Sequence, residues 1–400
     1  MSYWNLSEPL IFLCSNLKTS PDRGGALPQG AQARHHTPIP PRPHLSLPSP
    51  GSRRAVVVGA GSFGTAVAVL LARGGFRTTL QARTAEQCER LERDRENREY
   101  LSEVELPREL RIEAMSAGLG RADYVFLGVP SRGLDEVITG LDPAGLGRRT
   151  PVISLAKGLV PPDGLAPTTL LTLALGANRV ACVGGPAHAR EMVTEGAGLV
   201  AASVDTQLAA MIAGVFMRAG VVCEQSSDPV GVELSGVAKN AAALAAGATE
   251  AQGLNAAGAA AGHIFLEVWR FAERQGARPE SMIGLAGTGD LVATALAPQS
   301  RNRRAGELLA EGVPAGEIPE RIGQAVEALD MVPLLAAALE AAAIKAPVTH
   351  ALNRLIAGEL PLDDWVAQVR ATVPPPARFD SGAAWRRWWW RLRQRMRRAA

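Results

Sequence analysis

Short apolar runs alternate with helix-like stretches between residues 54 and about 225. The runs that predict strands lie at 55–59, 78–82, 124–129, 152–155, 180–183 and 198–202. Strands that alternate with helices are typical of a parallel sheet covered by helices on both faces. This half of the chain is therefore expected to form a doubly wound, mostly parallel α/β domain.

Strand-like patterns disappear from about residue 231 to 370. Ala, Leu and Glu dominate there, and Gly and Pro punctuate the sequence. Such a pattern predicts helices. We expect an α/β domain at 54–228 followed by an all-α domain at 229–372.

The two ends of the chain differ from this pattern. Residues 1–53 contain nine Pro and no periodicity, which is typical of a disordered leader or of an extension upstream of the true start. The tail, 373–400, ends with four Trp and seven Arg within 385–400. If helical, it could make peripheral contact with an anionic membrane surface; otherwise it is a basic tail with no fixed role.

Composition narrows the function classes. The net charge is only +3, and the excess of basic residues sits at the two ends, so a nucleic-acid-binding core is not expected. The four Cys (14, 88, 182 and 223) are far apart, with no CxxC pair and no Cys/His cluster. A disulfide framework or metal site is not expected, and a reducing cytoplasm fits.

A glycine-rich motif follows the first predicted strand. Gly59, Gly61 and Gly64 form GxGxxG, with Ser62 and Phe63 between them, and an apolar helix begins there. In this context the first glycine allows a tight turn, the second lets the backbone approach a pyrophosphate, and the third lets helix and strand pack closely. The free N–H groups of the helix favour phosphate. The motif predicts dinucleotide binding.

Arg83 ends the second predicted strand, where NAD-binding proteins usually place an acid for the ribose 2′-hydroxyl. An arginine could pair with a 2′-phosphate instead. NADP is therefore favoured over NAD as the cofactor, unless Arg83 is an ordinary surface residue.

Only four of the 42 basic Lys and Arg residues are Lys. Lys157 follows a strand, and Lys239, beside Asn240, sits in an Ala/Gly-rich predicted helix at 231–247. A lysine can lose a proton when desolvated, whereas an arginine cannot, so a buried lysine suits an acid at a carbonyl group that is being reduced. A surface charge is the alternative for Lys157.

The segment 287–304 predicts a phosphate site. Asp290 and Thr294 fall one helical turn apart, and Ser300 is a candidate N-cap before Arg301 and Asn302. A helix N-terminus beside a guanidinium group matches phosphate oxygens. His188, after the strand at 180–183, fits a packing or cofactor-wall role better than a catalytic one.

Several motifs in order give the chain, from about 54 to 370, a resemblance to the bacterial NAD(P)-dependent glycerol-3-phosphate dehydrogenase family. They are the glycine turn, Leu127-Gly128-Val129-Pro130-Ser131, Ala156-Lys157-Gly158-Leu159, Gly185-Pro186, Lys239-Asn240, and 284–291 with 300–304. The resemblance implies a Rossmann domain plus a helical domain, usually in a homodimer. It implies reversible hydride transfer between NAD(P)H and dihydroxyacetone phosphate, which gives sn-glycerol 3-phosphate for phospholipid synthesis.

The resemblance also implies residue roles. Lys239 matches the proton donor and acceptor, with Lys157 and Asp290 as further catalytic groups. The implied cofactor contacts are Gly59, Gly61, Ser62, Phe63, Gly64, Arg83, Lys157, Ala189, Arg301, Ala325 and Glu327. The implied substrate contacts are Lys157, Gly185, Lys239, Asn240, Asp290, Thr294, Ser300, Arg301 and Asn302.

The chain departs from the family pattern at several positions around the expected site. Ala187, Thr288, Ala295, Leu296, Ala257, Ile264, Phe265 and Ala328 replace the usual residues. Two alternatives therefore stay open: another two-domain hydroxyacid dehydrogenase, or a catalytically weakened, membrane-associated relative.

Overall fold

The computed structural model describes residues 53–142, 144–297 and 299–373. The predicted leader at 1–53, apart from Arg53, and the tail at 373–400, apart from Val373, lie outside the described residues. The strands are β1 (Arg54–Val58), β2 (Arg77–Ala82), β3 (Glu96–Asn97), β4 (Leu101–Glu105), β5 (Arg111–Ala114), β6 (Tyr124–Leu127), β7 (Val152–Ser154), β8 (Val180–Gly184), β9 (Gly198–Ala202) and β10 (Val222–Ser226).

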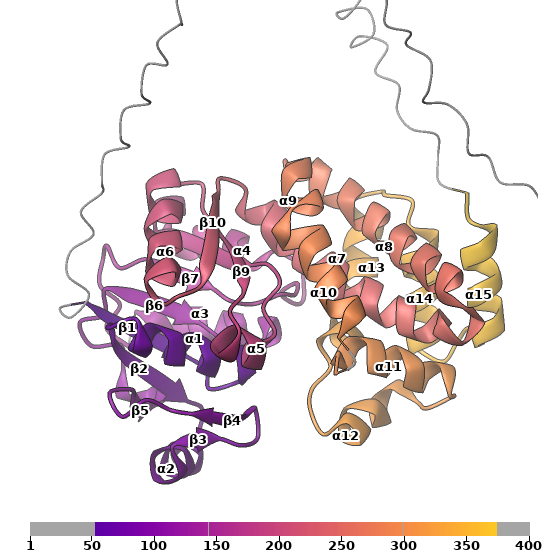
Figure 1. The fold of residues 1–400 in the computed structure, drawn as a ribbon. Helices are drawn as coiled ribbons and strands as arrows, with labels where there is room; N and C mark the ends of the chain where they lie inside the picture. Colours follow the sequence, from indigo (N-terminus) through magenta and orange to yellow (C-terminus); the bar gives the residue numbers. More distant parts are fainter. Residues whose placement is uncertain (1–52, 143, 298, 374–400) are drawn as a thin grey trace, which may run out of the picture. The chain divides into compact units, whose positions relative to one another are not determined.

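The helices of the first half of the chain connect these strands, and those of the second half follow them (Figure 1). They are α1 (Ser62–Arg73), α2 (Ala85–Asp94), α3 (Leu134–Leu141), α4 (Pro167–Leu175), α5 (Ala189–Thr194), α6 (Thr206–Arg218), α7 (Pro229–Thr249), α8 (Leu254–Arg274), α9 (Pro279–Ile283), α10 (Asp290–Leu296), α11 (Arg301–Ala310), α12 (Ile318–Ile322), α13 (Glu327–Ala341), α14 (Pro347–Ile356) and α15 (Leu362–Ala371).

Eight strands form one sheet in the order β10-β9-β8-β7-β6-β1-β2-β5, while β3 and β4 form a separate hairpin. The order reverses at β1 and β6, as in a doubly wound sheet. The mostly parallel α/β fold with a following helical region is therefore confirmed.

Two strands at one edge of the sheet, β9 and β10, run opposite to the other six. β9 pairs antiparallel with β8, and β10 then pairs parallel with β9. A parallel neighbour requires a connection long enough to return along the strand. The six-residue helix α5 does not carry the chain back, whereas the 13-residue α6 does so between β9 and β10.

Side chains of β1 alternate between two hydrophobic cores, because successive residues of a strand point to opposite faces. Ala55 and Val57 pack with α1 and α6 on one face, and Val56 and Val58 pack with α3 and α4 on the other. The predicted covering of both faces by helices is thus present.

The long helix α7 is the centre of the helical half. Almost all of its residues are buried, and Asp228 caps its first turn by accepting a hydrogen bond from the N–H of Gly231 at 2.9 Å. Two glycines let α11 approach it: a side chain at Gly247 would meet the carbonyl of Arg303, and one at Gly306 would meet the carbonyl of Leu244. This packing places the beginning of α11 beside Lys239 and Asn240.

Within the described ranges, no helix combines the length and the apolar character needed to cross a bilayer.

Candidate active site

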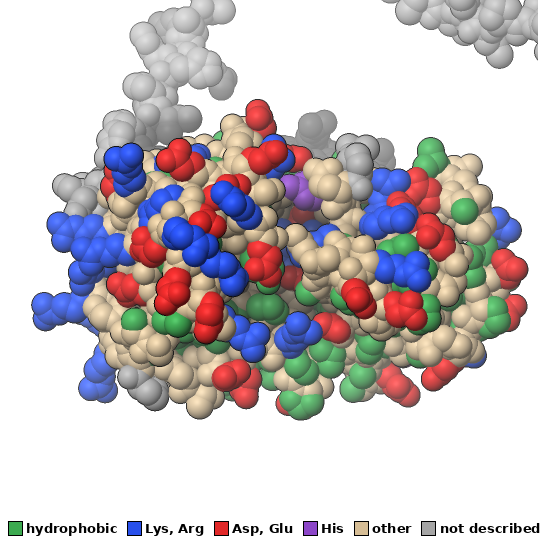
Figure 2. Space-filling view, turned by 90° about the horizontal axis from the view of Figure 1, so that it is seen from below, with side chains coloured by type: hydrophobic (Ala, Val, Ile, Leu, Met, Phe, Trp, Pro, Cys, Tyr) green, Lys and Arg blue, Asp and Glu red, His purple; other side chains and the backbone are tan. Residues whose placement is uncertain are grey.

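A cleft of about 810 Å³ is lined by residues of both the sheet half and the helical half. The sheet half contributes the beginning of α1 and the loops after β6, β7 and β8, and the helical half contributes α7 and the beginnings of α11 and α13. Figure 2 shows a hollow in the middle of one face of the molecule, with basic and acidic side chains around it. The carboxyl ends of β6, β7 and β8 therefore face helices of the second half.

The glycine turn leaves room for a ligand backbone. Gly59 has φ +107°, and a side chain at Gly64 would lie 2.1 Å from the carbonyl oxygen of Gly59. At Gly61, by contrast, an added Cβ would meet nothing within 4 Å, and no acidic side chain occupies the first turn of α1. The turn is therefore tightly packed at Gly59 and Gly64 and open at Gly61. The open space at Gly61 fits the pyrophosphate of a dinucleotide.

Asp290 joins the two lysines of the cleft. Its Oδ2 lies 2.8 Å from Nζ of Lys157, and its Oδ1 lies 3.5 Å from Nζ of Lys239. Lys157 also donates to the carbonyl oxygen of Gly185 at 3.0 Å, and Lys239 donates to the hydroxyl of Thr294 at 3.3 Å. One carboxylate thus holds two ammonium groups at one end of the cleft.

Burial and neighbouring charges set the proton affinity of these groups. Burial lowers the pKa of Lys239, Asp290 opposes that change, and Lys157 adds to it. For Asp290, burial acts to raise the pKa, but the two lysines outweigh it and the pKa is lowered. Lys239 is therefore an ammonium group that releases its proton more readily than an ordinary lysine.

Amide side chains fix the surroundings of the lysines. Asn240 donates to the carbonyl of Lys157 at 3.1 Å and to Glu327 at 3.3 Å. Asn302 in turn donates to Oδ1 of Asn240 at 2.9 Å and accepts a hydrogen bond from the N–H of Ala328 at 3.3 Å. These bonds link α7, α11 and α13 behind the cleft.

Helix α11 begins at the cleft wall. The hydroxyl of Ser300 accepts a hydrogen bond from the N–H of Arg303, which confirms the predicted N-cap. Arg301 lines the cleft and donates to the carbonyl of Ala325 at 3.2 Å. Arg303 instead pairs with Glu250, and Arg304 with Glu307, so these two arginines do not contact the cleft.

Most of the predicted site residues line this one cleft. They are Gly61, Ser62, Phe63, Lys157, Ala189, Lys239, Asn240, Thr294, Ser300, Arg301, Asn302, Ala325 and Glu327. Gly59, Gly64, Gly185 and Asp290 lie behind it and contact lining residues. Arg83 is exposed at the end of β2 and does not line the cleft.

Further residues outside the predicted catalytic and binding set also line the cleft. His188 lines the cleft and lies 3.4 Å from the carbonyl of Ala293, which fits the predicted wall position. Tyr100, at the β3–β4 hairpin, and Arg132 and Asp330, which pair at 3.0 Å across the mouth, were not singled out. Phe63 lies 5.5 Å from Nζ of Lys157, so its ring faces the ammonium group.

Among the described residues no cluster of His, Cys, Asp and Glu could hold a metal ion.

Two family models match the chain. The model described as NAD-dependent glycerol-3-phosphate dehydrogenase N-terminus matches residues 54–209, and the model of the C-terminus matches 228–367. A curated relative from Deinococcus radiodurans, named glycerol-3-phosphate dehydrogenase [NAD(P)+], is 40% identical over 76% of this chain and 90% of its own length. One of the same name from Halorhodospira halophila is 33% identical over 81% of this chain and 98% of its own.

Solved structures agree with these sequence matches. A crystal structure of glycerol-3-phosphate dehydrogenase from Coxiella burnetii superposes with a TM-score of 0.76 at 30% identity, covering 81% of this chain and all of that one. The Plasmodium falciparum structure, at 17% identity and a TM-score of 0.71, shares the fold and covers 82% and 96% of the two chains. The chain belongs to the NAD-dependent glycerol-3-phosphate dehydrogenase family.

Proposed function

We propose that this protein is a glycerol-3-phosphate dehydrogenase, which reversibly reduces dihydroxyacetone phosphate to sn-glycerol 3-phosphate with NADH or NADPH. The observation that carries the proposal is the pair of lysines held by Asp290 in the same cleft as the glycine turn. The expected role is to supply glycerol 3-phosphate for phospholipid synthesis in the cytoplasm.

The cofactor would lie with its pyrophosphate on the turn from Gly59 to Gly64, and it supplies or accepts the hydride when bound. Ser62, Phe63, Ala189, Ala325 and Glu327 would line its path. Arg83, exposed at the end of β2, is free to reach a 2′-phosphate and supports NADP over NAD.

The substrate phosphate would bind at the beginning of α11. Arg301 and Asn302 lie there in the first helical turn, where free N–H groups and a partial positive charge favour an anion. Binding of the phosphate, which lies away from the reacting carbon, would then orient the ketone carbon for hydride transfer.

Lys239 would act as the general acid in reduction and the general base in oxidation. Negative charge develops on the carbonyl oxygen during reduction, and the Lys239 ammonium group can stabilise it and donate the proton. Lys157 would add positive potential, while Asp290 and Thr294 would hold Lys239 in position. Gly185 would hold Lys157 through its carbonyl group.

The direct test is to follow absorbance loss of NADPH and NADH with dihydroxyacetone phosphate in the full chain. Oxidation of either cofactor that depends on this substrate supports the proposal. Unphosphorylated and phosphorylated ketones should be compared side by side. If an unphosphorylated keto acid is reduced as fast as dihydroxyacetone phosphate, another two-domain hydroxyacid dehydrogenase is favoured. If no ketone is reduced, a catalytically weakened relative is favoured.

We further propose a homodimer and a peripheral membrane contact through residues 385–400. The family resemblance supports the first, and the four Trp and seven Arg of that segment support the second. Sedimentation equilibrium tests the dimer. Sedimentation with anionic vesicles, with and without 385–400, tests the membrane contact, and equal sedimentation of the two forms would contradict it.

A further inference from the structure

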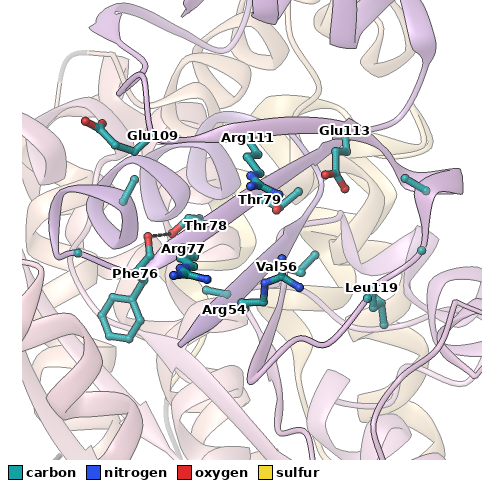
Figure 3. A pocket seen from close by; sticks show the side chains of 16 residues that line it. Arg54, Val56, Phe76, Arg77, Thr78, Thr79, Glu109, Arg111, Glu113 and Leu119 are labelled. Carbon is teal, nitrogen blue, oxygen red and sulfur yellow. Dashed lines mark hydrogen bonds between the residues drawn. The ribbon is translucent and has the colours of Figure 1, made fainter. Parts of the chain in front are cut away.

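A second cavity lies at the opposite end of the sheet from the cleft. Its volume is about 440 Å³, and it opens at the amino ends of β1, β2 and β5 (Figure 3). Doubly wound sheets bind their main ligands beyond the carboxyl ends of the strands, and four residues of strand span about 13 Å. The cavity shares no lining residue with the cleft, so it is a separate feature.

Three arginines on one side of the sheet rim this cavity. Arg54, Arg77 and Arg111 are the first residues of β1, β2 and β5. Arg54 lies directly opposite Arg77, and Thr79, two residues further along β2, lies opposite Arg111. Because alternate residues of a strand share a face, the three guanidinium groups gather on the same side of the sheet (Figure 3).

This arrangement brings three like charges together. Like charges directly opposite one another on neighbouring strands are destabilising. Among the described residues, none of the three arginines comes within ion-pair distance of a carboxylate, although Glu109 and Glu113 line the same cavity. Other arginines of the same half do have partners, such as Arg95, which donates to the carbonyl of Leu110 at 2.9 Å.

The floor and wall of the cavity offer contacts for an organic ligand. Val56 and Leu119 are apolar, and the half-buried hydroxyl of Thr79 makes no hydrogen bond to any residue that the structure describes. Gly118 and Gly120, with φ +79° and +55°, turn the chain along the wall. The connection from β5 to β6 contains only the 3-10 turn Met115–Ala117 and no α-helix, which leaves this part of the sheet open.

We propose that Arg54, Arg77 and Arg111 form a binding site for the phosphate groups of a small organic phosphate, separate from the active-site cleft. Guanidinium groups match phosphate oxygens in geometry and charge. The volume falls within the range of small-molecule sites, and Glu113 beside Thr79 can accept a hydrogen bond from a hydroxyl or amino group of the same ligand. The proposal does not depend on the activity proposed above.

Inorganic pyrophosphate is a suitable probe, measured by isothermal titration calorimetry on the full chain at low ionic strength. R77Q should weaken binding at this cavity by about tenfold or more, because a charge-assisted hydrogen bond is lost. R54Q/R77Q/R111Q should abolish this binding event, whereas any weaker binding at the glycine turn of the cleft should persist. The exposed Arg149 lies outside both cavities and provides a matched control, so R149Q should leave the affinity unchanged. E113Q should tighten binding, since it removes a negative charge from the cavity.

The same titration on R301Q separates this site from the cleft. Binding at Arg54, Arg77 and Arg111 should persist in R301Q and be lost in R54Q/R77Q/R111Q. Circular dichroism should show that both variants are folded. If the triple variant does not fold, R77Q alone carries the comparison. Affinity that follows R301Q rather than R77Q, or no binding of pyrophosphate by the unaltered chain, would overturn the proposal. Retention on phosphatidic acid vesicles without pyrophosphate binding would also overturn it, because the site would then recognise a lipid surface.

Discussion

Lys239 is buried on α7, and its ammonium group contacts a carboxylate and a hydroxyl group. Its ammonium group lies 3.5 Å from Asp290 and 3.3 Å from the hydroxyl of Thr294. We expect K239A to lower kcat by about two to four orders of magnitude, the range of general acid–base catalysis, while NADPH still binds. Stopped-flow or steady-state rates give the first quantity and fluorescence titration of NADPH the second. Near-unaltered turnover in K239A would refute the assignment.

The pH dependence of turnover should report the environment of Lys239. Reduction requires the protonated lysine, so kcat should fall as pH rises through the pKa of Lys239, which burial lowers below its ordinary value. Asp290 opposes that lowering. D290N should therefore lower the pKa further and move the descending limb to lower pH. A profile whose limb stays in place, or moves to higher pH, would contradict this electrostatic account.

Arg301 is the residue at which substrate phosphate binding can be separated from chemistry. It lines the cleft in the first turn of α11 and contacts the carbonyl of Ala325. R301A should raise KM for dihydroxyacetone phosphate by about tenfold or more, because hydrogen bonds to charged groups contribute about 1.5–3 kcal/mol. R304A is a matched control, since Arg304 lies outside the cleft and pairs with Glu307 on the same helix. An unchanged KM in R301A would count against a phosphate site there.

At the scale of elements, the β1–α1 turn separates the glycine needed for packing from the one needed for a ligand. A methyl group at Gly61 meets nothing, whereas one at Gly64 would lie 2.1 Å from the carbonyl oxygen of Gly59. G61A should therefore keep the melting temperature and weaken NADPH binding, because the methyl group projects into space that the pyrophosphate needs. G64A should lower both the melting temperature and the affinity. Calorimetry and cofactor titration on the pair test this, and equal effects of the two substitutions would contradict it.

The same turn shows which parts of the site can be predicted from sequence. Residues 59–64 are contiguous, so their strand–turn–helix context and their conformation follow from local rules. The caps at Ser300 and the helix around Lys239 are local in the same way, and the structure contains both. Local patterns therefore locate most groups of the cleft.

Contacts between distant segments do not follow from local patterns. Asp290 was expected to be a further catalytic group, but its ion pair with Lys157, 133 residues away, could not be read from spacing along the chain, because it depends on how distant segments such as α10 and α7 pack. Tyr100 and the Arg132–Asp330 pair were missed for the same reason. The edge strands β5 and β10 were also missed, because polar residues such as Arg111 and Glu224 interrupt their apolar pattern.

At the scale of the whole molecule, α7 connects the helical half to the sheet. Val232 of α7 packs with Cys182 of β8 and with Val200 and Ala202 of β9. The neighbouring Glu233 accepts hydrogen bonds from the N–H of Thr168 at 3.1 Å and from its hydroxyl at 2.6 Å, at the beginning of α4. We propose that 54–228 and 229–372 are two domains that unfold together, because this helix packs on both.

Glu233 should make the stability of this assembly depend on pH. Burial raises the pKa of its carboxyl group to about 8, from 4.5, against the hydrogen bonds from Thr168 that act to lower it. The folded protein therefore keeps a proton on Glu233 that the unfolded chain loses above pH 4.5. The stabilisation is complete below pH 4.5 and is lost as pH rises to about 8.

E233Q removes this titration and keeps a side chain of the same shape, whose carbonyl can accept the Thr168 N–H. The free energy of unfolding of E233Q minus that of the unaltered protein should thus rise from about pH 5 to about pH 9, by an amount on the order of a few kcal/mol. Urea denaturation at both pH values measures it, and the exposed E340Q provides a control whose difference should stay flat. A flat difference for E233Q would mean that Glu233 is ionised in the folded protein at neutral pH. The contact between α7 and α4 would then be held by a buried charge rather than by a neutral acid.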